Sequence, residues 1–263
     1  MQIIQAGDWA LVTGASAGIG REFCRQLAGA GLNLVLVARR RELLEALAGE
    51  LAGHGIRTLI LVEDLTEVGA PARIRSQVEA AGVRIRLLVN NAGCGKWGAF
   101  DEATPEIYDR MIRLNVAVPT ALCLEFLPHL KSHSPGAIIN VSSQAALQPV
   151  PYMAVYAASK AYLQSLSLAL HEEWRASGVH VQTLMPGPTA TEFDARAGAY
   201  ESTVVDRCPA AEVVRAALAH LGDGRPFVAS VGGIWKQRFF AGLFPYRMVV
   251  REVAKMFKPP AAR

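Results

Sequence analysis

The 263-residue sequence lacks features that several classes of protein require. It has four cysteines without CxxC spacing, and a chain of this length folds without a disulfide framework, so we expect free thiols at Cys24, Cys94, Cys123 and Cys208. No stretch approaches 18 consecutive apolar residues, so we expect no membrane-spanning helix. The opening MQIIQAGDWALVTG has neither the basic segment nor the cleavage site of a signal peptide, so we expect a cytoplasmic protein.

Charge of one sign is also not concentrated anywhere along the body of the chain. Lysine and arginine number 27 against 23 acids, a net charge of +4, but the basic residues form no stripe with interleaved aromatics. We therefore expect no nucleic-acid partner. No cluster of His, Cys, Asp and Glu has metal-ligand spacing, and we expect no metal.

Apolar runs that alternate with amphipathic stretches are present instead. Seven strand-like runs lie at 9–14, 32–38, 57–65, 85–93, 136–143, 179–187 and 226–233, and helical patterns lie at 19–30, 42–52, 69–81, 105–130, 156–177 and 210–221. In the second helix, the apolar face should contain Leu43, Leu47 and Leu51. The alternation predicts an α/β fold, a Rossmann-type doubly wound parallel sheet of seven strands with helices on both faces. Ligands of such a sheet bind at the carboxyl ends of the strands.

The first strand ends in a glycine-rich turn, TGASAGIG, from Thr13 to Gly20. Gly14 permits the tight turn, Gly18 allows a diphosphate to approach the backbone, and Gly20 allows the helix to pack on the strand. Ser16 and Ile19 lie in the same turn, and the helix N-terminus offers free N–H donors to an anion. Turn geometry alone would also explain these glycines.

A tyrosine and a lysine, Tyr156 and Lys160, stand four positions apart in YAASKAYLQSLSLALHEEW. On a helix, positions i and i+4 share a face, so the phenol and the ammonium should lie close together. The cation would favour the phenolate and lower the pKa of the phenol. Taken alone, the pair also fits a helix with one lysine extended along its surface.

Several motifs together carry a resemblance: Thr13-Gly14-xxx-Gly18-Ile19-Gly20, Asp64-Leu65, Asn90-Asn91-Ala92-Gly93, Asn115, Ser143, Tyr156-xxx-Lys160 and Pro186-Gly187. In this order and approximate spacing, the sequence resembles the short-chain dehydrogenase/reductase family over roughly residues 8–233. Ser143 precedes Tyr156 by 13 positions, as in the family's ketoreductases and hydroxysteroid dehydrogenases, which favours Ser143 over Ser142. The resemblance implies an NAD(P)-dependent oxidoreductase that acts on a carbonyl or alcohol.

Ketone reduction needs a hydride from one side and a proton from the other. Tyr156 is the candidate acid/base, and Lys160 would lower its pKa and, as the resemblance implies, hydrogen-bond the nicotinamide ribose. Ser143 would donate a hydrogen bond to the substrate oxygen, although it could simply be a turn residue. Asn115 matches the family's asparagine that holds a water between the lysine and solvent, but it could instead bond a backbone carbonyl.

The other motifs are expected to contact the cofactor. Asp64 could accept from the adenine amino group or cap the next helix. The motif at residues 90–93 would let the adenosine ribose approach and tie neighbouring strands together, or form only a turn. The resemblance assigns the Thr189 backbone and the Thr191 hydroxyl to the carboxamide and diphosphate. Pro188 departs from the pattern and lacks an N–H, so contacts must come from its neighbours.

The segment LVLVARRREL indicates which nicotinamide cofactor is used. An NAD site places an acid at the end of the second strand, where this chain has Ala38. Arg39 and Arg40 follow and offer guanidinium groups to a 2′-phosphate, although they could also be a solvated helix start. We therefore predict NADP(H).

The sequence indicates less about the substrate pocket and the C-terminal tail. Loops near the expected nicotinamide carry Trp97, Phe100, Tyr152, Met153 and Tyr200, which could form an apolar pocket or only pack the loops. We expect residues 1–235 to form the oxidoreductase domain and residues 236–263 a basic amphipathic extension. That extension could lie on an anionic membrane, cover an apolar pocket or build a subunit interface.

The sequence thus predicts an NADP(H)-dependent reductase of a ketone on an apolar (acyl, polyketide or steroid-like) substrate, forming a homo-oligomer, a dimer or tetramer. Two alternatives remain. One is a catalytically silent NADP(H)-binding regulatory protein, because a fold does not guarantee activity. The other is a sugar epimerase or dehydratase, whose relatives share YxxxK but carry TGxxGxxG and a longer substrate domain.

Overall fold

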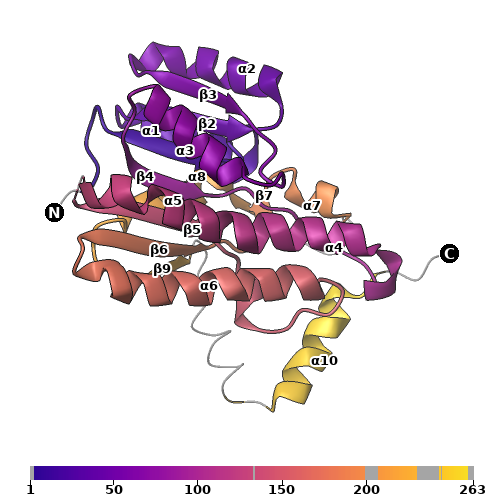
Figure 1. The fold of residues 1–263 in the computed structure, drawn as a ribbon. Helices are drawn as coiled ribbons and strands as arrows, with labels where there is room; N and C mark the ends of the chain where they lie inside the picture. Colours follow the sequence, from indigo (N-terminus) through magenta and orange to yellow (C-terminus); the bar gives the residue numbers. More distant parts are fainter. Residues whose placement is uncertain (1–2, 133, 199–206, 230–242, 244, 260–263) are drawn as a thin grey trace.

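A computed structural model describes residues 3–132, 134–198, 207–229, 243 and 245–259 of the chain. Its main sheet contains β1 (Trp9–Thr13), β2 (Asn33–Ala38), β3 (Thr58–Val62), β4 (Ile85–Asn90), β5 (Gly136–Val141), β6 (Val179–Met185) and β9 (Phe227–Ala229). The longer helices are α1 (Gly18–Gly29), α2 (Arg41–Leu51), α3 (Ala70–Ala80), α4 (Pro105–Ile112), α5 (Val118–Ser132), α6 (Ala154–Arg175), α8 (Ala210–Ala219) and α10 (Tyr246–Phe257). Figure 1 shows how they are arranged.

Shorter elements complete the described chain. They are the single turns η1 (Ala52–His54), η2 (Phe100–Glu102) and η4 (Gln144–Leu147), the π-helical turn η3 (Arg113–Ala117), the short helix α7 (Phe193–Ala197), and the strands β7 (Thr189–Ala190) and β8 (Cys208–Pro209). The last two pair with each other outside the main sheet. They hold the loop after β6 beside the start of α8.

The main sheet is fully parallel, with strand order β3-β2-β1-β4-β5-β6-β9. The strands read as continuous apolar runs because helices cover both faces, and β2 and β5 are buried at every position. The chain order reverses between β1 and β4, and such a reversal opens a crevice at the carboxyl ends of those strands. The predicted doubly wound fold is confirmed.

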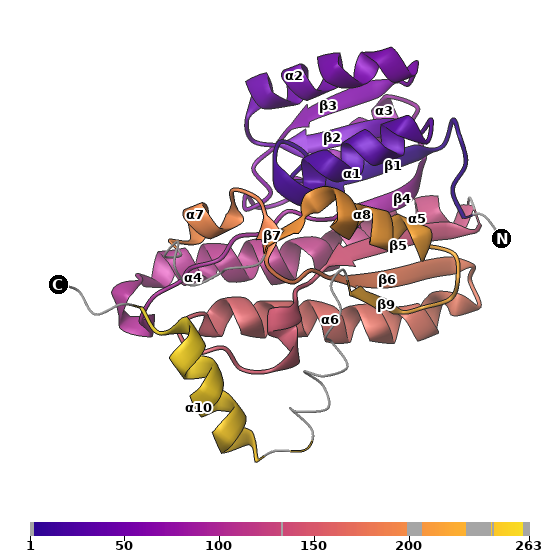
Figure 2. The ribbon, with the colours of Figure 1, turned by 180° about the vertical axis from the view of Figure 1, so that it is seen from behind.

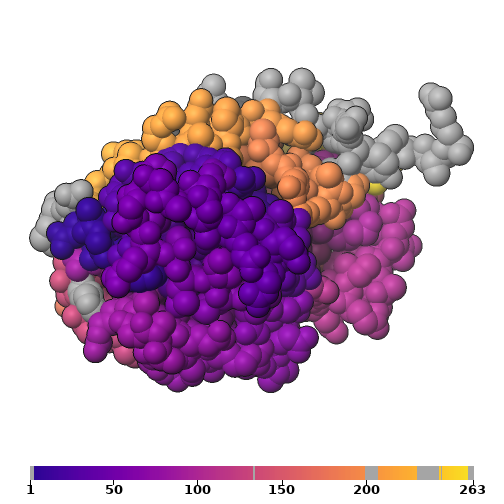
Figure 3. Space-filling view, turned by 90° about the horizontal axis from the view of Figure 1, so that it is seen from above, coloured from indigo at the N-terminus to yellow at the C-terminus, as the bar shows by residue number. Residues whose placement is uncertain are grey.

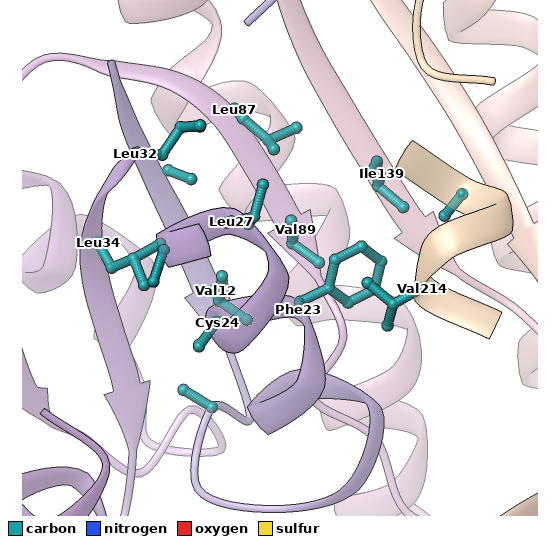
Figure 4. Close-up of a cluster of buried hydrophobic side chains, with 14 of the residues drawn as sticks. Val12, Phe23, Cys24, Leu27, Leu32, Leu34, Leu87, Val89, Ile139 and Val214 are labelled. Carbon is teal, nitrogen blue, oxygen red and sulfur yellow. The ribbon is translucent and has the colours of Figure 1, made fainter. Parts of the chain in front are cut away.

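Each face of the sheet has its own apolar core. On one face α1, α2 and α8 pack around Phe23, Leu27 and Val214 (Figure 4), and Figure 2 shows α1 and α8 side by side there. On the other face α3 and α5 bury residues such as Ile74 and Phe126. One expected core position is wrong: Leu43 is 39% exposed, and the inward position is Leu44, which follows the spacing Leu44, Leu47, Leu51.

The stretch Pro105–Ser132 forms one long helical segment, α4 and α5 joined by the turn η3. By length and mean hydropathy this segment could cross a membrane, although its apolar residues form no long unbroken run. The sequence-based expectation of no such helix therefore does not hold by this criterion. In the structure its apolar residues have another use. Leu122, Phe126 and Leu130 are fully buried against the sheet.

Helix α10 lies at the same end of the molecule as α7 (Figures 1 and 2). The expected domain boundary at 235/236 falls outside the described residues, and so does Tyr200. Seen from above, the indigo and purple surface of the first half of the chain is bordered by the orange surface of the segment that contains α8 (Figure 3).

Candidate active site

A cavity of about 780 Å³ lies at the carboxyl ends of the strands. Its lining includes most of the residues singled out from the sequence: Gly14, Ser16, Gly18, Ile19, Arg39, Arg40, Asp64, Leu65, Asn91, Ala92, Gly93, Ser143, Tyr156, Lys160, Pro186, Gly187, Thr189 and Thr191. These residues come from the segments that follow six different strands, β1 to β6, and from α6, which carries Tyr156 and Lys160. Only the parallel sheet brings them together.

The glycine-rich turn is held by Asn91. The Asn91 Nδ2 donates to the carbonyl oxygen of Thr13 at 2.8 Å. A Cβ on Gly20 would lie 2.3 Å from the Gly14 oxygen and 2.4 Å from that same nitrogen. Gly14 and Gly18 have φ values of 67° and 53°, which favour glycine. Gly20 therefore serves the packing of α1 on this turn, and Gly14 and Gly18 shape the floor of the cavity.

The N-terminus of α1 is suited to an anion. Its N-cap, Ala17, makes no side-chain cap, and the first turn contains no acidic residue. The N–H groups of that turn point outward from a helix end with partial positive charge. Thr191 lies beside it, because a Cβ on Gly18 would be 3.2 Å from the Thr191 Cβ. A diphosphate fits this cradle of bare backbone.

Two arginines stand at the end of the cavity beyond this turn. The Arg40 guanidinium donates to the Ser16 hydroxyl at 3.3 Å, and Arg39 lies 3.6 Å from the Asp64 carboxylate. Ala38 lines the same end, where an acid would repel a phosphate. The arginines, Ser16 and the helix N-terminus thus offer cationic and donor groups to a second phosphate.

Asp64 is used on both of its oxygens. Its Oδ1 accepts hydrogen bonds from the backbone N–H and the hydroxyl of Thr66, and its Oδ2 lies 3.2 Å from Arg110. Burial alone raises the pKa of Asp64, but the Thr66 hydrogen bonds and the charges of Arg39 and Arg110 outweigh it, and the pKa lies below its ordinary value. Asp64 thus forms a local turn with Thr66 and does not cap the next helix, α3, whose N-cap is Gly69. Asp64 still lines the cavity.

Asn90 and Asn115 lie behind the cavity wall. The Asn90 Nδ2 donates to the Asn140 side chain at 2.8 Å, which ties β4 to β5, and Asn140 donates to Ser167 of α6. Asn115 clamps the backbone of Cys94, accepting from its N–H at 3.0 Å and donating to its carbonyl at 2.9 Å. Asn90 therefore ties the two strands together, as one interpretation of the sequence proposed, and it is not among the residues that line the cavity.

Asn115 also positions neighbouring groups. Its Nδ2 donates to the Ser159 hydroxyl at 3.0 Å, so both of its amide hydrogens are used by protein acceptors. A Cβ on Gly93 would lie 3.2 Å from the Asn115 Oδ1 and 3.3 Å from the Lys160 Nζ. Gly93 thus allows Asn115 and Lys160 to converge. The backbone-bonding alternative for the Asn115 side chain is what the structure shows.

The two serines after β5 have different partners. The Ser142 hydroxyl donates to the carbonyl of Lys160 at 2.7 Å and is buried against α6. The Ser143 hydroxyl accepts from the Ala145 N–H at 3.1 Å, so Ser143 does begin a turn. It also lies within hydrogen-bonding reach of Tyr156, whose pKa it lowers. Ser143 can therefore serve both roles considered for it.

Tyr156 and Lys160 are both buried in the cavity wall, at 8% and 4% exposed. The Lys160 Nζ donates to the carbonyl oxygen of Val141 at 2.8 Å and lies 5.8 Å from the centroid of the Tyr156 ring. Burial lowers the pKa of Lys160 to about 8. Burial raises the pKa of Tyr156 to about 12, and the Ser143 hydrogen bond only partly offsets it. The sequence predicted a lowered phenol pKa, whereas burial raises it in this structure, and Lys160 is not among the groups that shift it.

The cavity has an apolar end next to Tyr156. Trp97, Met153 and Phe193 line it, and the rings of Phe193 and Tyr156 lie 5.3 Å apart. Of the aromatics expected there, Phe100 is 64% exposed and stacks on Tyr108 instead. Phe193 was not anticipated as a lining residue. Four residues of α10 also line the cavity, in agreement with one of the three roles considered for residues 236–263, the covering of an apolar pocket: Val249, Val253, Met256 and Phe257. In the sequence, the apolar period of 246–257 was the available signal for α10.

No group of three or more His, Cys, Asp and Glu side chains that could hold a metal occurs among the described residues. The four cysteines are free thiols.

The chain is similar to a known family of enzymes. The family model described as short chain dehydrogenase matches residues 8–202. A very-long-chain 3-oxoacyl-CoA reductase from Anas platyrhynchos is 35% identical over 71% of this chain. An inactive hydroxysteroid dehydrogenase-like protein 1 from Mus musculus is 34% identical over 79% of it. The matches span 61% and 62% of those two relatives, so the aligned part of this chain covers about three fifths of each.

Among solved structures, a short-chain dehydrogenase from Sphingobium yanoikuyae in complex with NADPH has a TM-score of 0.81 at 32% identity. The similarity covers 97% of this chain and 98% of that one. It therefore extends beyond the region that the family model matches.

Proposed function

Because this chain belongs to the short-chain dehydrogenase family, we propose that it is an NADP(H)-dependent oxidoreductase that reduces a ketone on a bulky apolar substrate. The relative named as a 3-oxoacyl-CoA reductase and the neighbour solved with NADPH support this activity and this cofactor. The observation that carries the proposal is one cavity that joins a phosphate-binding turn, two arginines and a buried Tyr156–Ser143–Lys160 group. A large apolar region adjoins that group.

The residues of the cavity fit NADP(H). The bare N-terminus of α1 and Gly18 would hold the diphosphate, and Arg39, Arg40 and Ser16 would hold the 2′-phosphate. Lys160 would donate to the nicotinamide ribose. Bound NADPH supplies the hydride, and the oxidised form carries a positive charge on its ring.

The catalytic roles follow from the protein groups around Tyr156. A phenol whose pKa is raised to about 12 stays protonated at neutral pH, so Tyr156 holds the proton at its Oη and donates it to the carbonyl oxygen of the substrate. Ser143 holds that oxygen by a second hydrogen bond. Lys160 stabilises the phenolate left behind when its own ammonium is charged. Phe193 and the apolar lining exclude water from the reacting atoms.

The test is a panel of ketones and aldehydes with the purified chain, followed by NADPH absorbance. The proposal predicts NADPH consumption with at least one bulky apolar ketone. NADPH binding without turnover of any carbonyl would favour the silent regulatory protein instead. The relative from Mus musculus whose name describes it as inactive supports this second candidate.

We propose further that the chain is a cytoplasmic homo-oligomer. Leu124 on α5 and Tyr162 on α6 are 70% and 41% exposed, and such apolar side chains on neighbouring helices support contact between copies. Size measurement in solution would test this.

The outer side of α10 carries Arg247, Arg251 and Lys255 beside the exposed Tyr246 and Met248. This combination supports a peripheral contact with an anionic membrane. Sedimentation with vesicles that contain anionic lipid, compared with neutral vesicles, would test it.

A further inference from the structure

One wall of the cavity comes from a segment that the family model does not match. That model ends at residue 202, whereas α10 supplies Val249, Val253, Met256 and Phe257 to the lining. These positions follow the spacing i, i+4, i+7 and i+8, so they occupy one face of the helix. Val253 is 9% exposed, while Met248 on the same helix is 53% exposed. We call the side that carries Val249, Val253 and Phe257 the inner face of α10. Val253 is its buried centre, Met256 lies at its edge and is 67% exposed, and Met248 lies on the outer face.

The end of α10 is attached to the loop after β4 through Trp97. The Trp97 Nε1 donates to the carbonyl oxygen of Phe257 at 2.9 Å, and the two rings lie 5.0 Å apart. The Trp97 backbone N–H donates to the carbonyl of Ala197 at the end of α7. Trp97 is only 4% exposed. Trp97 therefore links the end of α10 through its side chain and the end of α7 through its backbone.

The inner face of α10 and the reacting group belong to one apolar cluster. Val253, Trp97, Met153 and Tyr156 are buried members of it, and Phe193 packs against it. The part of a substrate that extends away from the Tyr156 hydroxyl would meet these side chains. Apolar surface rewards the burial of an apolar group and disfavours a polar one.

We infer that the inner face of α10 is the selectivity wall of this enzyme, binding the bulky hydrocarbon part of the ketone. Val253 and Phe257 contact that part, and Trp97 is a positioning residue that holds Phe257 in place. The inference rests on the proposed ketone reduction at Tyr156. Val253 and Phe257 would determine which ketones bind, and both lie outside the nucleotide-binding part of the fold.

The test compares Val253→Ala with Met248→Ala, two apolar truncations on opposite sides of one helix. Each is assayed with cyclohexyl phenyl ketone and with 2-butanone, and NADPH affinity is measured separately. Loss of two buried methyl groups should lower kcat/KM for the bulky ketone about tenfold, while 2-butanone and NADPH affinity change little. Met248→Ala should leave all three measurements unchanged.

Trp97→Phe tests the positioning role because it removes the N–H donor and keeps a ring. We expect KM for the bulky ketone to rise about fivefold with kcat nearly unchanged, and Trp97→Ala to have a larger effect. Equal losses with both ketones, or a Val253→Ala profile like that of Met248→Ala, would overturn the inference while leaving the proposed function intact. If the unmodified enzyme binds NADPH but reduces no ketone, the proposed function itself fails, and with it the inference.

Discussion

The Lys160 Nζ and the Val141 carbonyl oxygen are joined by a hydrogen bond of 2.8 Å. This bond anchors the ammonium at the end of β5, where it lines the cavity beneath Tyr156. The lysine is thus held by the sheet and buried by the site, and burial lowers its pKa to about 8. A lysine that titrates near neutral pH links cofactor binding to pH.

The affinity for NADPH should fall as pH rises through about 8. The lowered pKa of Lys160 means that its cationic form predominates below pH 8 and is lost above it, well before an ordinary lysine would titrate. Only the cation attracts an anionic ligand while donating to the ribose. Binding is measured by NADPH fluorescence between pH 7 and pH 9. Lys160→Met should bind more weakly and lose the pH dependence, and an unchanged slope in that variant would assign the titration to another group.

Arg39→Ala should weaken NADPH about tenfold and leave NADH nearly unchanged. Arg39 is 61% exposed at the side chain, so a value at the lower end of a charge-assisted hydrogen bond, about 1.5 kcal/mol, is appropriate. Arg41→Ala is the matched control, because Arg41 is equally exposed but pairs with Glu45. The measurement is the ratio of kcat/KM with the two cofactors. Equal loss with NADH and NADPH would contradict the assignment of the 2′-phosphate site.

Gly20→Ala should destabilise the protein by about 1–3 kcal/mol and weaken NADPH binding. Its added Cβ would stand 2.3 Å from the Gly14 oxygen, so α1 must move away from the turn. Gly29→Ala at the other end of α1 meets nothing within 4 Å and should be neutral or slightly stabilising. Urea unfolding of both variants checks the prediction, and similar midpoints for the two would show that the turn tolerates the methyl group.

Ser143→Ala and Ser142→Ala should separate chemistry from structure. Ser143→Ala should lower kcat about 10²-fold, because its hydroxyl lies within hydrogen-bonding reach of Tyr156. Its effect on stability should be limited to the loss of the Ala145 hydrogen bond. Ser142→Ala removes the buried hydrogen bond to the Lys160 carbonyl and should cost about 1 kcal/mol of stability. Kinetics and thermal unfolding of both variants provide the comparison. A larger loss of kcat in Ser142→Ala than in Ser143→Ala would reverse the two roles.

The fold was predictable from the sequence because parallel strands buried on both faces have a local signature. Runs such as NLVLVA and GAIINV contain one asparagine each and no other polar side chain, and each is followed by a helical period. The error at Leu43 is local, since Leu43 and Leu44 are both apolar and only the entry angle of α2 selects the inward one. The helix at Pro105–Ser132 was expected, but its high mean hydropathy was not, because scattered polar residues interrupt its apolar runs.

The lining of the site was predictable where a residue type has few alternatives, as with Gly14, Gly18 and the two arginines. Bonding partners were less predictable. Asn90 bonds the side chain of Asn140, and Asn115 bonds the backbone of Cys94. Both pairs are brought together by the tertiary fold, so the local sequence does not indicate them. The prediction of a lowered pKa for Tyr156 differs from the structure for the same reason, because the burial of Tyr156 depends on the packed site and not on the YxxxK spacing.

The central claim is that Tyr156 supplies the proton, and Tyr156→Phe tests it most directly. The substitution removes the hydroxyl and keeps the ring that packs 5.3 Å from Phe193, so the cavity should stay formed. We predict that kcat for the preferred ketone falls by about 10²- to 10⁴-fold while the Kd for NADPH stays within about twofold. Turnover that persists near the unmodified rate, with NADPH still bound, would contradict the account.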